Sequence, residues 1–439
     1  MDMKKPKILL ITEAANPEWT SVPLVGWSIS QAISKIADVH IVTQIRNRDA
    51  FLRAGLAENR DFTSIDSEFI GSKLWRIGSF LRGGKGKGWT TVQVFSAFSY
   101  YYFEHLIWKE FAKRIKKGEF DIVHRITPLS PTIPSLIAKK CKDAGVPFVV
   151  GPLNGGLPWP KGYDSVRIKE KEWFSYIRSA YRFLPGYRST LKNASAIIVG
   201  SIGTYDQIPE KYHSKCIYIP ENGIDEKKIH IKRKRNAELP LKAVFMGRLV
   251  PYKGADMLIE AVIPLIKKGL LELEIIGDGP QRSELENIAK ENKLENSIRF
   301  AGWIKHEFMQ GKLSEFDIFV FPSIREFGGA VVLEAMSAGL VPIVVAYGGP
   351  GEIVTPETGF LIKMGPRKNL IESFYKKLLE LSGNASIIDF KSNLAAERAR
   401  NLFAWSIKAA QVLKVYDWVL GRAKKKPDFG MPLKLQKVV

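Results

Sequence analysis

The chain has 439 residues, 45% of them hydrophobic and 25% charged, with 66 Lys and Arg against 45 Asp and Glu. It is too long for one ordinary domain, and its composition is that of a soluble globular protein, so we expect two domains of about 200 residues. The formal net charge of +21 at pH 7 favours anionic partners, namely nucleic acid, an anionic membrane or phosphorylated substrates. The two cysteines, Cys141 and Cys216, belong to no ligand-spaced cluster, which argues against a disulfide framework or zinc site and fits a reducing cytoplasm.

The N-terminal residues are basic and then apolar, as in a signal peptide. The apolar run stops at Glu13, which is too early for the apolar core of such a peptide, so we interpret it as a first buried strand. The sequence has no uncharged stretch of about 18 apolar residues, so we predict no transmembrane helix.

Short apolar runs then alternate with helix-like stretches along both halves of the chain. Such fully apolar strands separated by helices indicate parallel sheets covered on both faces, and two series indicate two doubly wound α/β domains. Ligands of open parallel sheets bind outside the carboxyl ends of the strands, so we expect the domains to face each other across a cleft. The predicted strands are 7–12, 39–44, 120–125, 146–151 and 195–201, then 241–247, 271–277, 297–303, 318–323 and 341–346, with the divide within 219–242.

The strand 318–323 is followed by an unusual combination of acid and glycine. Phe327, Gly328 and Gly329 occupy a strand-to-helix turn, Glu326 precedes them, and Glu334 lies within the helix. Glycines let a ligand approach the backbone, and free N–H groups at a helix start attract phosphate. Both carboxylates can accept hydrogen bonds from sugar hydroxyls. The structural alternative is an ordinary helix N-terminus, where the helix dipole favours acidic neighbours.

A second strand end brings two cations to a helix start. Gly247 ends the strand 241–247, Arg248 and Lys253 lie in the loop, and a helix follows from Gly254. A guanidinium and an ammonium above a helix start are suited to clamp a diphosphate. Two solvated cations in a surface loop remain the alternative.

Five segments between about 221 and 354 together resemble the nucleotide-sugar-binding domain of the family 4 (group 1) retaining glycosyltransferases, whose fold is the two-domain GT-B fold. They are "ENGID", "GRLVPYKG", "IIGDGP", "AGW" and the Glu-x7-Glu segment that ends in "SAGLVPIV…GGPGEIV". Their order and spacing make this resemblance specific.

The resemblance implies a role for each residue of the two turns. Arg248 and Lys253 would bind the diphosphate, Glu326 would contact the donor sugar, and Glu334 would hold the ribose hydroxyls. The leaving diphosphate would gain charge, which the cations and the helix start would stabilise, and it would itself act as the base. Such enzymes use no metal, and the sequence has no Asp-x-Asp motif or metal-spaced cluster. The amides that would meet the sugar or phosphate are those of Phe327, Gly328 and Gly329.

In the first half the family pattern is weaker. The usual Gly-Gly pair before the first helix is replaced by Gly26-Trp27, so Gly26 either brings backbone near the diphosphate or simply starts the helix. His124 lies at the end of the predicted strand 120–125, while Ile126 occupies the position where one branch of the family has a His near the reaction centre. His124 either hydrogen-bonds the donor sugar as a catalytic residue or has a structural role.

The turn "GPLNGG" (151–156) resembles a cleft-facing loop of one branch of the family. Its candidates for contact with the donor sugar or the acceptor are Asn154, Gly155 and Gly156. A turn that needs positive φ explains the glycines equally well.

Residues 71–118 contain ten Lys and Arg but only two Glu, and the basic residues are interleaved with aromatic ones. Residues 166–192 show a similar mixture of basic and aromatic residues. This pattern suits an anionic membrane surface, although single-stranded nucleic acid uses the same residue types and a core helix with a basic face explains part of it. The glycosyltransferase resemblance favours the membrane, because many such enzymes modify lipid-linked acceptors.

We therefore predict a cytoplasmic GT-B glycosyltransferase of the hexosyltransferase type, peripheral on the inner face of the membrane and active in glycan biosynthesis. Residues 1–218 would bind a lipid-linked or glycan acceptor and 219–404 a UDP- or GDP-linked sugar, without a metal, cofactor or nucleic-acid partner. The last helix, about 405–423, would return to the first domain, before a basic tail (424–439). The open alternatives are a soluble acceptor, a nucleotide-sugar epimerase, or a non-enzymatic basic module that binds membrane or nucleic acid.

Overall fold

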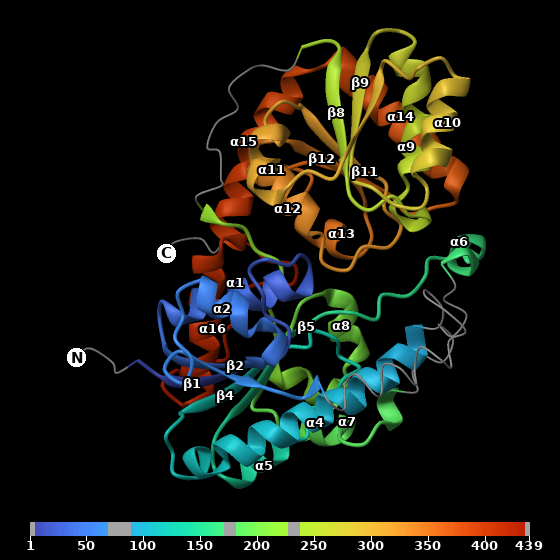
Figure 1. The fold of residues 1–439 in the computed structure, drawn as a ribbon. Helices are drawn as coiled ribbons and strands as arrows, with labels where there is room; N and C mark the ends of the chain where they lie inside the picture. The colour runs from blue at the N-terminus through green and yellow to red at the C-terminus, as the bar shows by residue number, and fades with distance from the viewer. Residues whose placement is uncertain (1–4, 69–88, 171–180, 227–237, 435–439) are drawn as a thin grey trace. The chain divides into compact units, whose positions relative to one another are not determined.

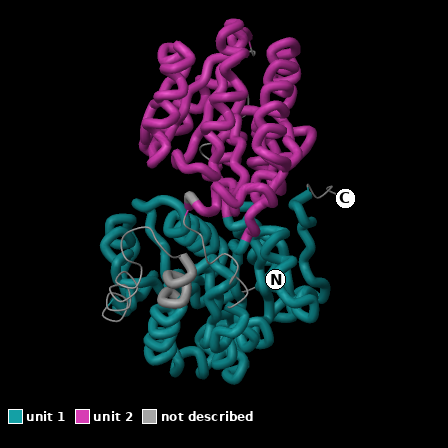
Figure 2. Tube along the Cα trace, turned by 90° about the vertical axis from the view of Figure 1, so that its right-hand side faces the viewer, with its two compact units in different colours: residues 1–156, 171–221, 405–434 teal, residues 157–170, 222–404, 435–439 magenta. Residues whose placement is uncertain are grey.

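A computed structural model describes residues 5–68, 89–170, 181–226 and 238–434. The chain forms two compact units (Figure 1, Figure 2). Unit 1 comprises residues 1–156, 171–221 and 405–434, and unit 2 comprises 157–170, 222–404 and 435–439. The last helix thus belongs to unit 1, whereas residues 157–170 pack with unit 2. Parts of the basic segments 71–118 and 166–192, of the region 219–242 and of the tail lie outside the described residues.

Unit 1 is built on a seven-stranded parallel sheet with the order β3-β2-β1-β4-β5-β6-β7. Its inner strands are buried on both faces, and Ile8 to Ile11 have no exposed surface. The strands are β1 (Lys7–Thr12), β2 (Asp38–Gln44), β3 (Phe62–Ile65), β4 (Ile122–Thr127), β5 (Phe148–Leu153), β6 (Ala196–Val199) and β7 (Cys216–Tyr218).

Helices cover both faces of this sheet. Successive residues of a strand point to opposite faces, and on β4 His124 contacts Tyr416 of α16 while Arg125 lies over Tyr100 of α4. α16 also packs against α1, and α5 against α4 and α7. Lys408 of α16 donates a 2.5 Å hydrogen bond to the carbonyl of Pro220, which ties the last helix to the end of the first half. The helices are α1 (Val22–Ser34), α2 (Arg48–Arg53), α4 (Trp89–Lys116), α5 (Ile137–Asp143), α7 (Tyr187–Asn193), α8 (Ile202–Gln207) and α16 (Trp405–Val419), with the 3-10 turns η1 (Ile45–Asn47) and η3 (Glu210–Lys215).

Unit 2 has a six-stranded parallel sheet with the order β10-β9-β8-β11-β12-β13. The central strand β11 is fully buried from Ile318 to Phe321, as expected for a sheet covered on both faces. The strands are β8 (Leu241–Met246), β9 (Leu271–Ile276), β10 (Ile298–Gly302), β11 (Ile318–Phe321), β12 (Val341–Val345) and β13 (Phe360–Ile362).

The helices of unit 2 form two sets by their contacts: α9 packs against α10 and α14, and α12 against α13 and α15. All ten predicted strands are present, and the prediction of two doubly wound α/β domains is confirmed. The elements are α6 (Asp164–Lys169), η5 (Pro251–Lys253), α9 (Ala255–Ile266), α10 (Arg282–Glu291), α11 (His306–Leu313), α12 (Ala330–Ser337), α13 (Gly349–Ile353), α14 (Arg367–Gly383) and α15 (Ser386–Phe403).

Candidate active site

The two turns that the sequence singled out follow neighbouring strands. β8 and β11 pair in parallel, so their carboxyl ends lie at the same edge of the sheet. The loop with Arg248 and Lys253 follows β8, and the turn with Glu326 and Gly329 follows β11. This edge is where open parallel sheets bind their ligands.

Lys253 and Glu326 meet although they are 73 residues apart: the Lys253 Nζ forms an ion pair with the Glu326 Oε2. Both side chains are largely shielded, with 14% and 17% of their surface exposed. The Lys253 Nζ also lies 5.1 Å from the centre of the Phe321 ring. The pair neutralises two charges that would otherwise be costly to shield from water. A diphosphate that bound here would compete with Glu326 for the ammonium.

Glycines fix the backbone around Glu326. The Glu326 Oε1 accepts a 3.4 Å hydrogen bond from the amide of Gly329, which precedes α12 in a left-handed conformation with φ 65°. The amide of Gly349 donates to the Glu326 carbonyl at 3.0 Å. A Cβ on Gly348 would lie 2.2 Å from that carbonyl oxygen, so the backbone of Glu326 packs against residue 348 at a distance that only glycine allows.

The other predicted donor residues of unit 2 lie in the same two turns and in α12. Arg248 is exposed, and its side chain makes no hydrogen bond or ion pair within the described residues, so its guanidinium is available to an anion. Phe327 and Gly328 are half-buried in the turn, and Glu334 is half-buried in α12. The structure thus brings the predicted residues of unit 2 to one edge of one sheet.

Gly26, from unit 1, lies within α1 rather than in the loop before it. It is buried, and a Cβ there would lie 2.2 Å from the carbonyl oxygen of Ala14 and 3.1 Å from the Thr127 methyl carbon. The structure therefore gives this glycine a packing reason, namely the close approach of α1 to the ends of β1 and β4.

His124 is fully buried between β4, β5 and α16. Its Nε2 lies 2.8 Å from the Gly151 carbonyl oxygen and its Nδ1 lies 2.7 Å from the Tyr416 hydroxyl. A carbonyl can only accept, so the neutral ring carries its proton on Nε2 and Nδ1 accepts from Tyr416. The pKa of His124 is lowered to about 4, chiefly by burial; the hydrogen bond to Gly151 opposes this shift and the charge of Arg125 adds to it. Both ring nitrogens are thus engaged inside unit 1, which favours the structural role.

Asn154 and the two following glycines form a buried network with α8. The Asn154 side chain is 9% exposed, donates to Glu221 at 2.6 Å and accepts from the Ser201 hydroxyl at 2.9 Å. Gly155 and Gly156 have φ values of 150° and 75° and are half-buried. The Asn154 amide thus holds the turn to Glu221, and contact with a sugar stays a prediction for all three residues.

Sequence reasoning missed Arg325, which directly precedes Glu326. Arg325 is only 5% exposed, and its Nε donates to the carbonyl of Leu157 at 3.2 Å. Its guanidinium carbon lies 4.7 Å from the ring centre of Trp159 and 5.0 Å from that of Phe327. Its place beside Glu326 was the available signal, but two of its partners, Leu157 and Trp159, lie in the first half of the sequence, where no local pattern points to them.

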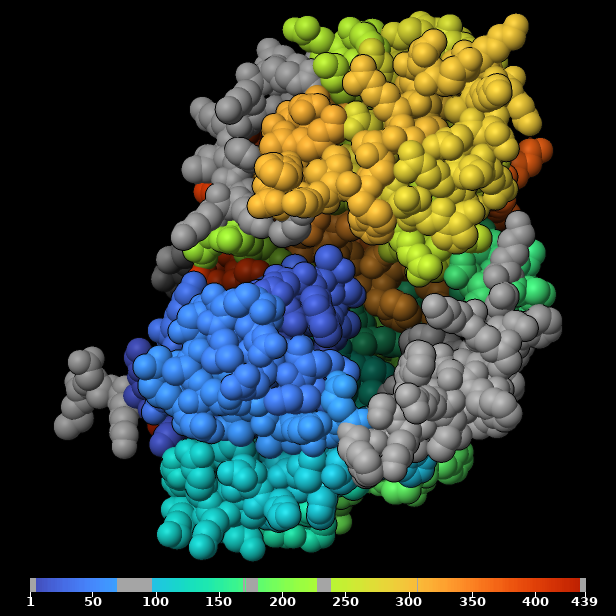
Figure 3. Space-filling model, viewed as in Figure 1, coloured from blue at the N-terminus to red at the C-terminus, as the bar shows by residue number. Residues whose placement is uncertain are grey.

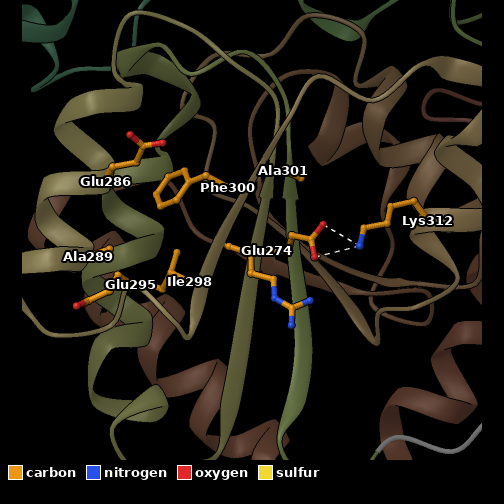
Figure 4. Close-up of a pocket in the computed structure, with 9 residues that line it drawn as sticks. Glu274, Glu286, Ala289, Glu295, Ile298, Phe300, Ala301 and Lys312 are labelled. Carbon is orange, nitrogen blue, oxygen red and sulfur yellow. Dashed lines mark hydrogen bonds and ion pairs between the residues drawn. The ribbon is translucent and has the colours of Figure 1, made fainter.

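A separate hollow of about 520 Å³ follows the edge strand β10 beside α10 and α11 (Figure 4). This α10–α11 region forms part of the exposed face of unit 2 seen in Figure 3. Glu274 points toward Lys312, whose Nζ lies 2.9 Å from its Oε1. A wall rich in carboxylates does not suit a diphosphate. Its lining shares no residue with the predicted donor site and consists of Glu274, Glu286, Ala289, Glu295, Ile298, Arg299, Phe300, Ala301 and Lys312.

No helix within the described residues is long and apolar enough to cross a membrane. Within the same residues, no group of three or more His, Cys, Asp or Glu side chains could hold a metal ion. Independence of a metal stays a prediction.

Known proteins resemble the chain in this same region. Residues 226–386, which include Arg248, Lys253, Glu326 and Glu334, match the sequence model of the family described as Glycosyl transferases group 1. A 2-deoxystreptamine N-acetyl-D-glucosaminyltransferase of Niallia circulans is 34% identical over 137 residues, which are 31% of this chain and 35% of that relative. The chain thus spans about a third of the length of the first curated relatives that it matches.

Solved structures resemble the chain over nearly its whole length. Sucrose-phosphate synthase of Thermosynechococcus elongatus has a TM-score of 0.61 at 17% identity, covering 95% of this chain and 100% of that one. Alr3699/HepE of Anabaena, in complex with UDP and glucose, has a TM-score of 0.56 at 16% identity, covering 94% and 100%. The predicted GT-B fold and the resemblance of the chain to the group 1 glycosyltransferases are confirmed.

Proposed function

We propose that the protein is a retaining family 4 glycosyltransferase that moves a sugar from a nucleoside-diphosphate sugar to a hydroxyl acceptor. The observation that carries the proposal is the convergence of Arg248, Lys253 and Glu326 at the adjacent ends of β8 and β11. It occurs within the region that matches the group 1 glycosyltransferases. Two cations, a helix start and a carboxylate supply what a diphosphate and a sugar each require.

In the proposed reaction the bond between the anomeric carbon and the diphosphate oxygen breaks, and a bond from that carbon to the acceptor oxygen forms on the same face. The acceptor proton passes to the leaving diphosphate. Arg248, Lys253 and the amides at the start of α12 stabilise the charge that develops on the diphosphate. Glu326 binds the sugar and Glu334 the ribose. Donor binding draws Lys253 from Glu326 toward the phosphate, because the diphosphate carries more charge than the carboxylate.

The donor nucleotide is proposed to be UDP or GDP, without a metal. The complex of Alr3699/HepE with UDP and glucose supports a uridine nucleotide by analogy of fold.

Thermal unfolding with UDP, GDP and ADP tests this site. A nucleotide at a hundred times its dissociation constant adds about 2.7 kcal/mol to the free energy of unfolding, so one nucleotide should raise the melting temperature of the wild type. The shift should disappear in Lys253→Ala and Glu334→Ala and persist in the presence of EDTA. No shift with any nucleotide would contradict the proposal and favour the basic binding module.

We also propose a lipid-linked or glycan acceptor at the inner face of the membrane, with the protein cytoplasmic and peripheral. An exposed aromatic patch on unit 1 supports this. Phe98 and Phe183 are 47% and 84% exposed, and they are linked by the ring contact of Phe98 with Tyr101 and the hydrogen bond from Tyr101 to the Pro185 carbonyl. Arg182, which adjoins Phe183 in the chain, is exposed, as are Arg188 and Lys192 of the following helix α7.

Product analysis distinguishes the proposed transferase from a nucleotide-sugar epimerase. Incubation with donor alone would convert one nucleotide sugar into its epimer if the protein were an epimerase. The proposed transferase requires an acceptor for sugar transfer and leaves the configuration of the donor sugar unchanged.

A further inference from the structure

Residues 157–163 belong by sequence to the first half of the chain but pack within unit 2. We infer that this segment, called the strap below, forms a supporting wall of the donor site, and that Trp159 is a positioning residue for the sugar-binding Glu326. The inference rests on the proposed function, because it names what holds the sugar contact of that same site.

The first observation is the environment of Arg325. Shielding a guanidinium from water is costly unless it finds partners, and the strap supplies two of them. The Leu157 carbonyl accepts from the Arg325 Nε at 3.2 Å, and the Trp159 ring centre lies 4.7 Å from the guanidinium carbon. Phe327 adds a second ring at 5.0 Å. Arg325 directly precedes Glu326, and its guanidinium lies between the strap and the Phe327 ring, so the strap holds the chain on the N-terminal side of that carboxylate.

The second observation is that the strap reaches the other loops of the site. The Tyr347 hydroxyl donates to the Pro158 carbonyl at 2.7 Å, and a Cβ on Gly348 would lie 2.7 Å from a methyl of Leu157. The Trp159 ring also meets Tyr252 edge-on, with the centroids 6.3 Å apart. Tyr252 adjoins Lys253. The strap therefore contacts a residue next to each member of the Lys253–Glu326 pair.

The end of the strap is anchored on the same unit. The Tyr163 hydroxyl donates to the Gly365 carbonyl at 2.9 Å, and the following helix α6 packs on η5, which ends at Lys253. Contacts at Leu157, Trp159 and Tyr163 thus hold the strap along its length.

A specific loss follows if Trp159 positions Arg325. Without the ring, the guanidinium loses one face of its support and can turn toward the adjacent carboxylate of Glu326, in competition with Lys253. The sugar contact would then suffer, whereas the phosphate contacts of Arg248 and the ribose contact of Glu334 would remain. A general loosening of the fold would weaken nucleotide and sugar binding alike.

Calorimetry on the full chain distinguishes these cases, with UDP and GDP as probes beside UDP-glucose, UDP-N-acetylglucosamine and GDP-mannose. The comparison uses the nucleotide that the wild type binds and the corresponding nucleotide sugar. The affinity of Trp159→Ala for the nucleotide should be within about threefold of the wild-type affinity, whereas its affinity for the nucleotide sugar should be at least tenfold lower. Trp159→Phe, which keeps an aromatic face for the cation, should restore most of that tenfold. Arg325→Lys should not, because an ammonium lacks the planar stacking surface. Phe390→Ala, which removes a ring that is 68% exposed on α15, is the matched control and should leave both affinities unchanged.

Two results would overturn the inference alone: equal losses for nucleotide and nucleotide sugar in Trp159→Ala, or wild-type binding of both. If Trp159→Ala does not fold, the same comparison of nucleotide affinity with nucleotide-sugar affinity is made in Trp159→Phe and Arg325→Lys. An equal ratio of the two affinities in these two variants would overturn the inference. Failure of the wild type to bind any of these nucleotides would instead overturn the proposed function, and the inference with it.

Discussion

At the scale of single residues, side chains that look equally functional in the sequence have different surroundings. Lys253 and Glu326 are shielded at the carboxyl edge of a sheet and neutralise each other. An anionic ligand can replace Glu326 as the partner of Lys253. The sequence places His124 at a strand end, yet β4 continues to Thr127, so His124 lies within the strand and its two nitrogens are satisfied inside unit 1. The direction of a strand in the sequence predicts which residues lie near its carboxyl end. It does not predict which of those side chains are open to a ligand and which are buried with all their hydrogen bonds satisfied.

The buried His124 should make the stability of the protein depend on pH. Its pKa of about 4 in the folded state lies below the ordinary value of about 6.5, so the unfolded chain binds the proton more readily. The stabilisation by the neutral ring is complete above pH 6.5 and is lost as the pH falls toward 4, by up to about 3 kcal/mol. Urea unfolding should therefore show that His124→Gln is less stable than the wild type at pH 7 and that the difference shrinks at pH 4.5.

The exposed His105 provides the control for this prediction. His105→Gln should have nearly the same free energy of unfolding as the wild type at both pH values. An equal destabilisation of His124→Gln at pH 7 and pH 4.5 would contradict the assignment of His124 as a neutral buried base.

At the scale of elements, the site consists of turns after β8, β11 and β12 that hold one another in place. The amide of Gly349 donates to the carbonyl of Glu326, and the Leu157 carbonyl of the strap accepts a hydrogen bond from Arg325. The conformation of the β11–α12 turn is therefore set by contacts from elsewhere in unit 2 as well as by its own glycines.

Gly348→Ala should show this dependence. Gly348 has φ 63° and ψ −150°, a conformation that strains an alanine by about 2 kcal/mol, and the new Cβ would collide with the Glu326 carbonyl. We expect lower stability and at least tenfold weaker binding of the nucleotide sugar, measured by denaturation and calorimetry. Gly311→Ala, on α11 of the same unit and facing open space, should leave binding unchanged, and a similar loss in both variants would contradict the argument.

The elements also show how far the sequence leads. The ten apolar runs predicted ten of the strands, because burial on both faces leaves a continuous signal. The sequence did not predict β3, whose four residues are fully buried only at the two ends, or β7 and β13, which have only three residues each. The strap was missed for a different reason. Its sequence "LPWPKGY" has no periodicity, and its bond to Arg325 spans 168 residues, so only the folded chain reveals the pairing.

At the scale of the whole molecule, the net charge of +21 and the aromatic patch of unit 1 lead to a prediction about membranes. The protein should sediment with vesicles of phosphatidylcholine and phosphatidylglycerol but not with phosphatidylcholine alone, and salt should weaken this binding by screening. Phe183→Ser should weaken it further, because the ring no longer enters the headgroup region.

Phe390→Ser, a change to an exposed ring of unit 2, is the matched control and should bind vesicles as the wild type does. Binding that does not depend on the anionic lipid, or that is unaffected by Phe183→Ser, would contradict membrane docking through this patch and favour the soluble acceptor.

The chain passes from one unit to the other several times, which limits how its two halves can be exchanged with those of a related protein. The boundary at 221/222 is accompanied by others at 156/157, 170/171 and 404/405. A fragment cut near residue 220 would separate Arg325 from Leu157 and Trp159, and His124 from Tyr416, so each piece would lose part of its own interior. Exchange of the proposed donor site with that of a relative therefore requires that residues 157–170 travel with residues 222–404, and residues 405–434 with the first half, rather than a single crossover. Natural shuffling of these halves faces the same constraint, so a single recombination point would rarely yield a stable hybrid.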